Sequence, residues 1–199
     1  MTRALVIYCH PKATSFTAAV RDTVLASLQA KGAEVRLIDL YAAQYAPVLT
    51  AAEWDGYLDT PANRLAVADD VAALQWADTL IFIYPTWWYG LPAMLKGWLD
   101  RTLLPDVAFL MPDGPNQTIR PGLTRITRLG VFTTCGASLW LTLFVGSPGK
   151  RLLTRGIGLL CAKGHRTAFA AHYLMDHSTP ATRARHLANV SAKMTKLLR

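Results

Sequence analysis

The chain has 199 residues, 52% of them hydrophobic, and its 21 lysine and arginine residues outnumber its 13 aspartate and glutamate residues, for a formal net charge of +8. This length fits a single domain over residues 1–199 with a sizeable buried core. The basic residues are dispersed, without a Lys/Arg run or an aromatic–basic repeat, which argues against a nucleic-acid-binding protein. A modest positive charge suits an anionic small molecule or cofactor at least as well.

A membrane span and a metal site are not expected either. The uncharged run at residues 79–95 contains two prolines and a glycine and is shorter than the roughly 20 apolar residues of a spanning helix. The residues after Met1 lack the pattern of a secretory signal, so we expect a cytoplasmic protein. The three cysteines, Cys9, Cys135 and Cys161, match no zinc-binding spacing, and we expect buried free thiols.

Strands and helices alternate along the predicted chain. Apolar runs and helical spacing predict, in chain order, a strand at 4–9, a helix at 17–31, a strand at 34–40, a helix at 64–76, a strand at 79–84, a helix at 92–104, a strand at 128–134, a helix at 148–161, a strand at 167–174 and a helix from 180 to the end. This order indicates an α/β fold, a doubly wound five-stranded parallel sheet with helices on both faces. The long connection 105–123 is typical of a lid or binding loop.

The loop after the first strand carries groups that suit a phosphate. His10 and Lys12 are followed by the small hydroxyl side chains of Thr14, Ser15 and Thr17. A helix begins here, and its first N–H groups are unpaired and carry a partial positive charge. These residues would form a phosphate cradle, although an ordinary serine or threonine helix cap remains an alternative. The loop is neither a P-loop nor a dinucleotide fingerprint.

The loop after the third strand carries three consecutive aromatic residues. We expect the strand to end at Pro85, so that Thr86, Trp87, Trp88 and Tyr89 form a loop. Three adjacent aromatics beside proline and glycine cannot all point into a core. Some of them are therefore predicted to line a site for a flat ring at the carboxyl edge of the sheet.

The loop after the fourth strand offers small residues and backbone donors. It includes Thr133, Thr134, Cys135 and Gly136. In a doubly wound sheet this loop, the aromatic loop and the phosphate loop can surround one crevice. A flavin nucleotide needs this combination, because its phosphate binds at a helix terminus, its ring stacks on aromatics, and its N1–C2 carbonyl edge needs N–H donors as it becomes negative on reduction.

The same segments carry a family resemblance. His10-Pro11 with Ser15-Phe16, the run from Tyr84 to Arg101, and Phe132-Thr-Thr-Cys-Gly136 resemble the NAD(P)H:quinone oxidoreductase family of flavodoxin-like proteins, which includes modulators of drug activity and azoreductases. The resemblance implies a flavodoxin-like fold, a flavin cofactor, NAD(P)H as electron donor, ping-pong hydride transfer to quinone-like acceptors, and a homodimer with two shared sites.

The resemblance also implies roles for particular residues. His10, Ser15, Phe16 and Thr17 would hold the phosphate and ribitol, the run from Pro85 to Tyr89 would wall the ring, and Thr133 to Gly136 would hold its far edge. No side chain is expected as a catalytic acid or base, since the flavin carries the hydride chemistry. The short chain lacks a separate adenosine-binding segment, which slightly favours FMN over FAD. The sequence leaves open NADH against NADPH and the physiological acceptor.

Two departures from the family pattern concern the ring's far edge. Cys135-Gly136 stands where the family usually has two glycines, so a thiol is expected near the flavin. Residues 137–148 also lack the tyrosine and histidine that manage charge on the reduced ring in the best-known mammalian members. Backbone donors or the helix that starts near Pro148 must then take over that task.

Two other functions are consistent with the same fold. The chain could be a flavodoxin that carries single electrons between proteins, but such carriers are typically acidic and the charge here is +8. It could also be an ancillary regulatory subunit of a membrane transport protein, as some family members are.

Overall fold

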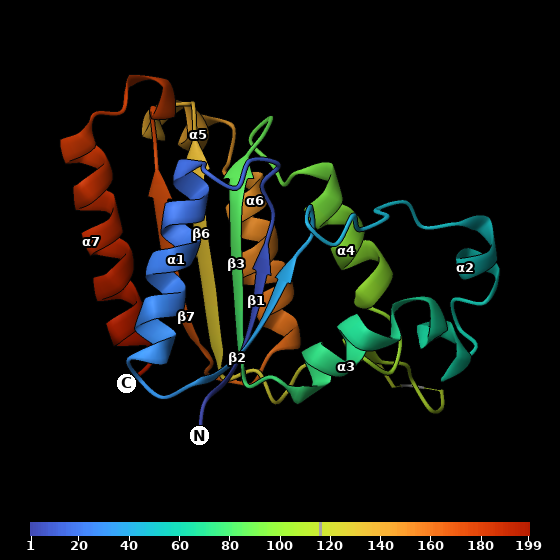
Figure 1. Ribbon diagram of the computed structural model, residues 1–199. Helices are drawn as coiled ribbons and strands as arrows, with labels where there is room; N and C mark the ends of the chain where they lie inside the picture. Colours follow the sequence, from blue (N-terminus) through green and yellow to red (C-terminus); the bar gives the residue numbers. More distant parts are fainter. Residues whose placement is uncertain (116) are drawn as a thin grey trace.

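The computed structural model describes residues 1–115 and 117–199, and a five-stranded parallel sheet forms its centre (Figure 1). The spatial order is β2-β1-β3-β6-β7. The strands are β1 (Arg3–Tyr8), β2 (Glu34–Asp39), β3 (Thr79–Thr86), β6 (Arg128–Cys135) and β7 (Arg166–His172). Every neighbouring pair is parallel. The predicted α/β fold with its five strands is therefore confirmed.

Helices cover both faces of this sheet (Figure 1). On one face, α1 (Phe16–Gln29) and α7 (Pro180–Leu197) pack against each other and share a core with the strands. On the other face lie α3 (Ala68–Trp76), α4 (Ala93–Thr102) and the helical segment that starts with α6 (Pro148–Arg151). No helix in the described ranges is long and apolar enough to cross a membrane.

Alternation along the strands divides the buried side chains between two cores. In β1, Leu5 and Ile7 pack toward α3 and α4, whereas Val6 and Tyr8 pack toward α1 and α7. All four side chains are fully buried. A strand that is covered on both faces must be apolar at every position, which explains the continuous apolar run of its sequence.

Two predicted helices are not regular α-helices throughout. The one expected at 64–76 is α-helical only from Ala68 and is preceded by a 3₁₀ helix, η1 (Ala62–Val67). The one expected at 148–161 begins as α6, continues as a π-helix, η2 (Leu152–Ile157), and ends in a 3₁₀ turn, η3 (Gly158–Leu160). Gly158 packs closely against His165, since a Cβ at that position would lie 3.1 Å from the His165 ring.

Two short helices, α2 (Ala51–Asp55) and α5 (Leu139–Phe144), were not predicted. Each spans fewer than two turns, too few for a helical period to show. Side-chain caps start both of them: Thr50 accepts a hydrogen bond from the Glu53 N–H at 3.2 Å, and Ser138 accepts one from the Leu141 N–H at 3.2 Å.

The prediction that β3 ends at Pro85 is wrong, since the strand runs on to Thr86. Ile83 accepts a hydrogen bond from the Cys9 N–H on the β1 side, and strand alternation points the nitrogen of Pro85 to that same side. The β1 strand ends at Tyr8, opposite Ile83. Pro85 therefore has no β1 residue beside it that needs an N–H donor from β3. Proline is tolerated on such a free flank.

The connection 105–123 contains a short antiparallel pair, β4 (Phe109–Leu110) and β5 (Arg120–Pro121). Phe109 packs against the core on the α3 and α4 side. Figure 1 shows the connection near α3, away from the carboxyl ends of the strands. None of its described residues lines the main cleft identified below, which does not support the expected lid.

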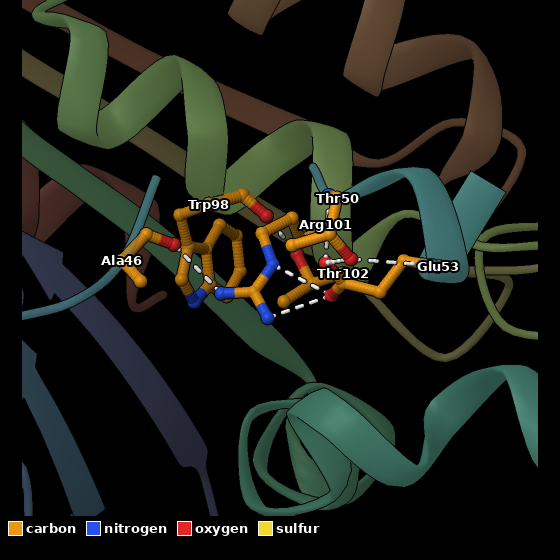
Figure 2. A network of polar contacts seen from close by, with 6 residues as sticks. All are labelled: Ala46, Thr50, Glu53, Trp98, Arg101 and Thr102. Atoms are coloured by element: carbon orange, nitrogen blue, oxygen red, sulfur yellow. Dashed lines mark hydrogen bonds and ion pairs between the residues drawn. The ribbon is translucent and has the colours of Figure 1, made fainter. Parts of the chain in front are cut away.

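A network around Arg101 fastens the connection after β2 to α4 (Figure 2). The Arg101 guanidinium donates from Nε and Nη2 to Glu53 Oε1 at 2.8 and 2.6 Å, and from Nη1 to the Ala46 carbonyl at 2.6 Å. Glu53 also accepts from Thr50, and the guanidinium lies 5.4 Å from the Tyr45 ring centroid. The Arg101 and Glu53 side chains are only 11% and 17% exposed, so the pair is shielded from water.

Replacing Glu53 by Gln should lower the free energy of unfolding by about 2 kcal/mol near neutral pH, because the shielded guanidinium loses its counter-charge. Burial raises the pKa of Glu53, but hydrogen bonds from Thr50 and Arg101 and the guanidinium charge outweigh it, so the pKa is lowered. The contribution is therefore present above the pKa of an unfolded carboxyl, about 4.3, and disappears as the pH falls through the lower folded value.

Denaturant titrations of wild type and Glu53→Gln at neutral and acidic pH would measure this difference. The matched control is Asp100→Asn, which removes the carboxylate of a solvent-exposed pair with Lys96 and should cost less than about 0.5 kcal/mol. Equal losses in the two variants would contradict the expectation.

Candidate functional site

A cleft of about 1040 Å³ opens beyond the carboxyl ends of β1, β3 and β6, and we call it the main cleft. Open α/β sheets bind ligands at this position. The lining residues are His10, Phe16, Thr17, Pro85, Thr86, Trp87, Trp88, Tyr89, Thr134, Cys135, Gly136, Ala137, Met175 and Asp176. The fold thus brings together all the predicted site residues except Thr14, Ser15 and Thr133.

The N-terminus of α1 forms one end of the main cleft. Ser15 is the N-cap, and its hydroxyl accepts a hydrogen bond from the Ala18 N–H at 3.1 Å. Among the hydrogen bonds of the described residues, none uses the N–H groups of Phe16 and Thr17. Ser15 therefore acts as an ordinary cap, while two free N–H groups remain for an anion. Thr14 is exposed and lies outside the cleft.

The buried side chain of Thr17 ties this helix end to the sheet. Its hydroxyl lies 3.0 Å from the Thr134 hydroxyl, on the face of β6 that α1 covers. This bond joins the phosphate loop to the loop after β6 across 117 residues of sequence. It fixes the distance between two walls of the main cleft.

Neighbouring groups hold His10 and Phe16 in place, and the Arg183 guanidinium lies 5.8 Å from the ring centroid of Phe16. Nδ1 of His10 lies 3.0 Å from the Lys12 nitrogen, and burial lowers the pKa of His10, so the ring is neutral near neutral pH. The Phe16 ring packs against the rings of His172 and His186 at centroid distances of 5.3 and 5.9 Å. Burial and the neighbouring His172 lower the pKa of His186 to about 4, so it supports Phe16 as an uncharged ring.

The aromatic wall is a strained turn. The Gly90 N–H donates to the Trp87 carbonyl at 2.9 Å, and the two residues between them have positive φ, 48° at Trp88 and 62° at Tyr89. This is a type I′ turn, which normally takes glycine or asparagine at both positions. Bulky residues in this region are outliers that cluster at functional sites.

Orientation differs among the aromatics of this turn. Trp87 is 42% exposed, and the Trp88 side chain is 96% exposed. All three aromatics line the main cleft, as predicted. Trp88, however, has almost no contact with the rest of the chain.

The loop after β6 forms the far wall. In the described part of the chain, the N–H groups of Gly136 and Ala137 donate to no protein acceptor. Gly136 lies close to Asp176, since a Cβ there would be 3.2 Å from Asp176 Oδ2. The loop therefore offers free donors, with one carboxylate beside them.

Thr133 faces away from the main cleft, to the opposite side of β6. Its hydroxyl lies 2.8 Å from the Thr86 hydroxyl, which joins β3 to β6 at their carboxyl ends. Cys135 shares this side: its sulfur lies 3.8 Å from the Thr142 hydroxyl, and the residue is buried. The thiol expected near a ligand therefore contacts α5.

Sequence analysis missed Ala137, Met175 and Asp176 as lining residues. The last two follow β7, whose carboxyl end lies at the same edge of the sheet. That position was available as a signal, because loops after adjacent parallel strands meet there. No group of three or more His, Cys, Asp or Glu residues that could hold a metal occurs among the described residues.

Comparison with known proteins places this architecture in a family. A family model described as a flavodoxin-like fold matches residues 2–143. The chain belongs to this flavodoxin-like family. The resemblance identified from the sequence is confirmed, and so is the flavodoxin-like fold.

Individual relatives of this flavodoxin-like protein match it at moderate or low sequence identity. NAD(P)H dehydrogenase [quinone] 1 of Cavia porcellus is 34% identical over 147 residues, which are 64% of this chain and 54% of that protein, so the chain spans about half its length. The crystal structure of Smu.1420 from Streptococcus mutans has a TM-score of 0.83 at 26% identity and covers 98% of this chain and 100% of its own. An FMN-dependent NADH-azoreductase of Bacillus anthracis, solved with FMN, has a TM-score of 0.76 at 15% identity and covers all of both chains.

Replacing Trp88 by Asn should stabilise the ligand-free monomer by about 1 kcal/mol, because asparagine tolerates a left-handed backbone and the exposed indole makes few contacts there. For a chain of this size the melting temperature should rise by about 2–4 °C, measured by calorimetry. Trp87→Asn is the control: its backbone is not left-handed, so no gain is expected. A loss of stability in Trp88→Asn would contradict the strain assigned to the turn.

Proposed function

We propose that this protein is a flavin-dependent oxidoreductase that takes hydride from NAD(P)H and passes it to a quinone-like acceptor. The observation that supports it best is the convergence of three features in one cleft: a free helix N-terminus, an aromatic turn and a loop with free N–H donors. A curated relative is named as an NAD(P)H dehydrogenase acting on quinone.

The chemistry of the cleft fits a flavin nucleotide. The free N–H groups at Phe16 and Thr17 suit a phosphate, Trp87 offers a face to an aromatic ring, and the N–H groups of Gly136 and Ala137 suit carbonyl oxygens of that ring. We favour FMN over FAD, since a protein of the same fold and matching length holds FMN. When bound, the flavin supplies the capacity to accept a hydride and release it again.

Residues of the chain then bind and orient rather than transfer protons. His10 is neutral near neutral pH, and burial raises the pKa of Tyr84 and Tyr173, so none of them titrates in that range. The balanced reaction takes NAD(P)H, a proton and a quinone to NAD(P)⁺ and a hydroquinone. Its protons would come from solvent, since the main cleft is open.

We also propose that the protein acts as a homodimer with part of each site covered by the second copy. On α5, Leu139, Trp140, Leu143 and Phe144 are exposed, and Trp140 stacks on Phe144 with centroids 5.6 Å apart. Exposed apolar clusters of this kind mark interaction surfaces. A second protomer on α5 would lie next to the exposed Trp88 and give that indole a partner.

A cytoplasmic location and one domain over residues 1–199 complete the proposal. The cysteines support the location, because Cys9, Cys135 and Cys161 are free and buried, and free thiols persist in reducing compartments. A small-molecule acceptor rather than a nucleic acid is the proposed partner, given the apolar, aromatic lining of the main cleft.

Adding FMN to purified protein at a hundredfold excess over its dissociation constant should stabilise it by about 2.7 kcal/mol, seen as a higher melting temperature. Riboflavin, which lacks the phosphate, should bind about tenfold more weakly if the α1 terminus holds that group. NADH or NADPH alone should then bleach the bound flavin, and a quinone should restore its colour.

Other outcomes would identify other functions. Flavin that binds but is not bleached by NADH or NADPH would point to an electron carrier, and bleaching without quinone turnover would point to a regulatory subunit. A colourless protein that neither FMN nor FAD stabilises would overturn the proposed function.

For the dimer, Phe144→Glu should shift the protein from dimer to monomer in light scattering coupled to size exclusion, because it places a charge in the apolar α5 cluster. Trp54→Glu is the matched control, since Trp54 is also an exposed aromatic but lies on α2. The same mass for wild type and both variants would argue against an α5 interface.

A further inference from the structure

A side chamber adjoins the main cleft beneath the loop after β6. Its volume is about 20 Å³, enough for about one water molecule. It shares three residues with the main cleft: Thr86, Tyr89 and Cys135. The remaining lining comes from Tyr84, Thr133, Thr142, Ser147, Lys150, Phe169, Ala171 and Tyr173. A charge on the chamber wall therefore acts on the main cleft across a single layer of side chains.

Lys150 is brought to this chamber by close packing of α6 against the aromatic turn. The Gly149 N–H donates to the Tyr89 carbonyl at 3.3 Å, and a Cβ on Gly149 would lie only 3.3 Å from the Gly90 carbonyl carbon. Glycine at position 149 thus allows α6 to begin directly against the turn. The next side chain, Lys150, lines the chamber with its Nζ 4.7 Å from the Phe169 ring centroid.

Positive charge is scarce among the residues that line the two cavities, and the Arg183 guanidinium lies behind the lining, 5.8 Å from the ring centroid of Phe16. His10 is neutral, and the buried hydroxyls of Tyr84 and Tyr173 are neutral as well. Asp176 places a carboxylate beside Gly136, where it opposes further negative charge. Among the described residues that line either cavity, Lys150 is the only lysine or arginine, and it makes no ion pair within the described chain.

A flavin in the main cleft gains negative charge at its N1–C2 edge on reduction, and residues 137–148 hold no tyrosine or histidine to balance it. We propose that Lys150 supplies the positive charge that stabilises the reduced cofactor, acting from the side chamber through the wall at Thr86 and Cys135. The inference rests on the proposed function. Lys150 is an exposed residue, so solvent screens part of its charge. The part that acts through the low-dielectric wall between the two cavities is stronger than it would be in water.

The test is the two-electron midpoint potential of the bound flavin, measured by titration against a reference dye. Lys150→Met should weaken binding of the reduced flavin relative to the oxidised flavin by about tenfold, which lowers the potential by about 30 mV. Affinity for oxidised flavin should stay within about twofold of wild type, because the oxidised ring is uncharged. Lys150→Arg keeps the charge and should restore most of the potential.

Arg151→Met is the matched control. It removes the same charge one residue along α6, but Arg151 lies outside the chamber lining, with Nη1 3.7 Å from the position of a Cβ on Gly146. Its potential should match that of wild type. Two results would overturn this inference and leave the proposed function standing. One is equal potentials in Lys150→Met and Arg151→Met, and the other is loss of oxidised flavin from Lys150→Met. A wild-type protein that binds no flavin would overturn the proposed function as well.

Discussion

The unequal lengths of β1 and β3 set the geometry on which the site depends. The β1 strand ends at Tyr8, opposite Ile83, whereas β3 and β6 stay paired to Thr86 and Cys135. After β1 the chain turns into α1 beside the part of β3 that has no β1 partner. The main cleft occupies the space left by this difference in strand length. Right-handed crossovers place α1 on one face and the helices after β2 and β3 on the other. The main cleft therefore opens at the point where successive crossovers go to opposite faces of the sheet. The strand connections alone create it, without displacement of any side chain.

The aromatic turn gains its shape from this extended strand pair. Trp88 and Tyr89 hold left-handed backbones that cost about 1–2 kcal/mol each. Pairing of Thr86 with Cys135 holds the start of the turn against β6, and the contact of Gly149 with Gly90 holds its end against α6. In the isolated chain the Trp88 indole is almost wholly exposed, so no burial of this side chain offsets the backbone strain. In the proposed dimer with bound flavin, contact with the ligand or the second protomer would supply that burial.

The sequence was sufficient for the sheet and much of the site, because both follow from local patterns. Strand-like segments predicted all five strands, most of them as apolar runs, and the loops after β1, β3 and β6 supplied most of the cleft lining. The path of β3 through Pro85 depends on where a neighbouring strand ends, which its own residues do not encode. Lys150 reaches the side chamber through the packing of Gly149 against Gly90, and α5 is too short to show a period.

Cys135 and Lys150 belong to one structural unit near the far wall of the main cleft. Cys135 stands where the family resemblance leads us to expect glycine, and its thiol lies 3.8 Å from the Thr142 hydroxyl on α5. A glycine there would leave that contact unmade. Thr142 accepts hydrogen bonds from the N–H and hydroxyl of Ser147, the residue before α6 begins at Pro148. The cysteine thus braces α5, and α5 positions the start of α6, from which Lys150 projects. The thiol that the sequence leads us to expect near the flavin thus contacts α5 and supports the segment that carries Lys150.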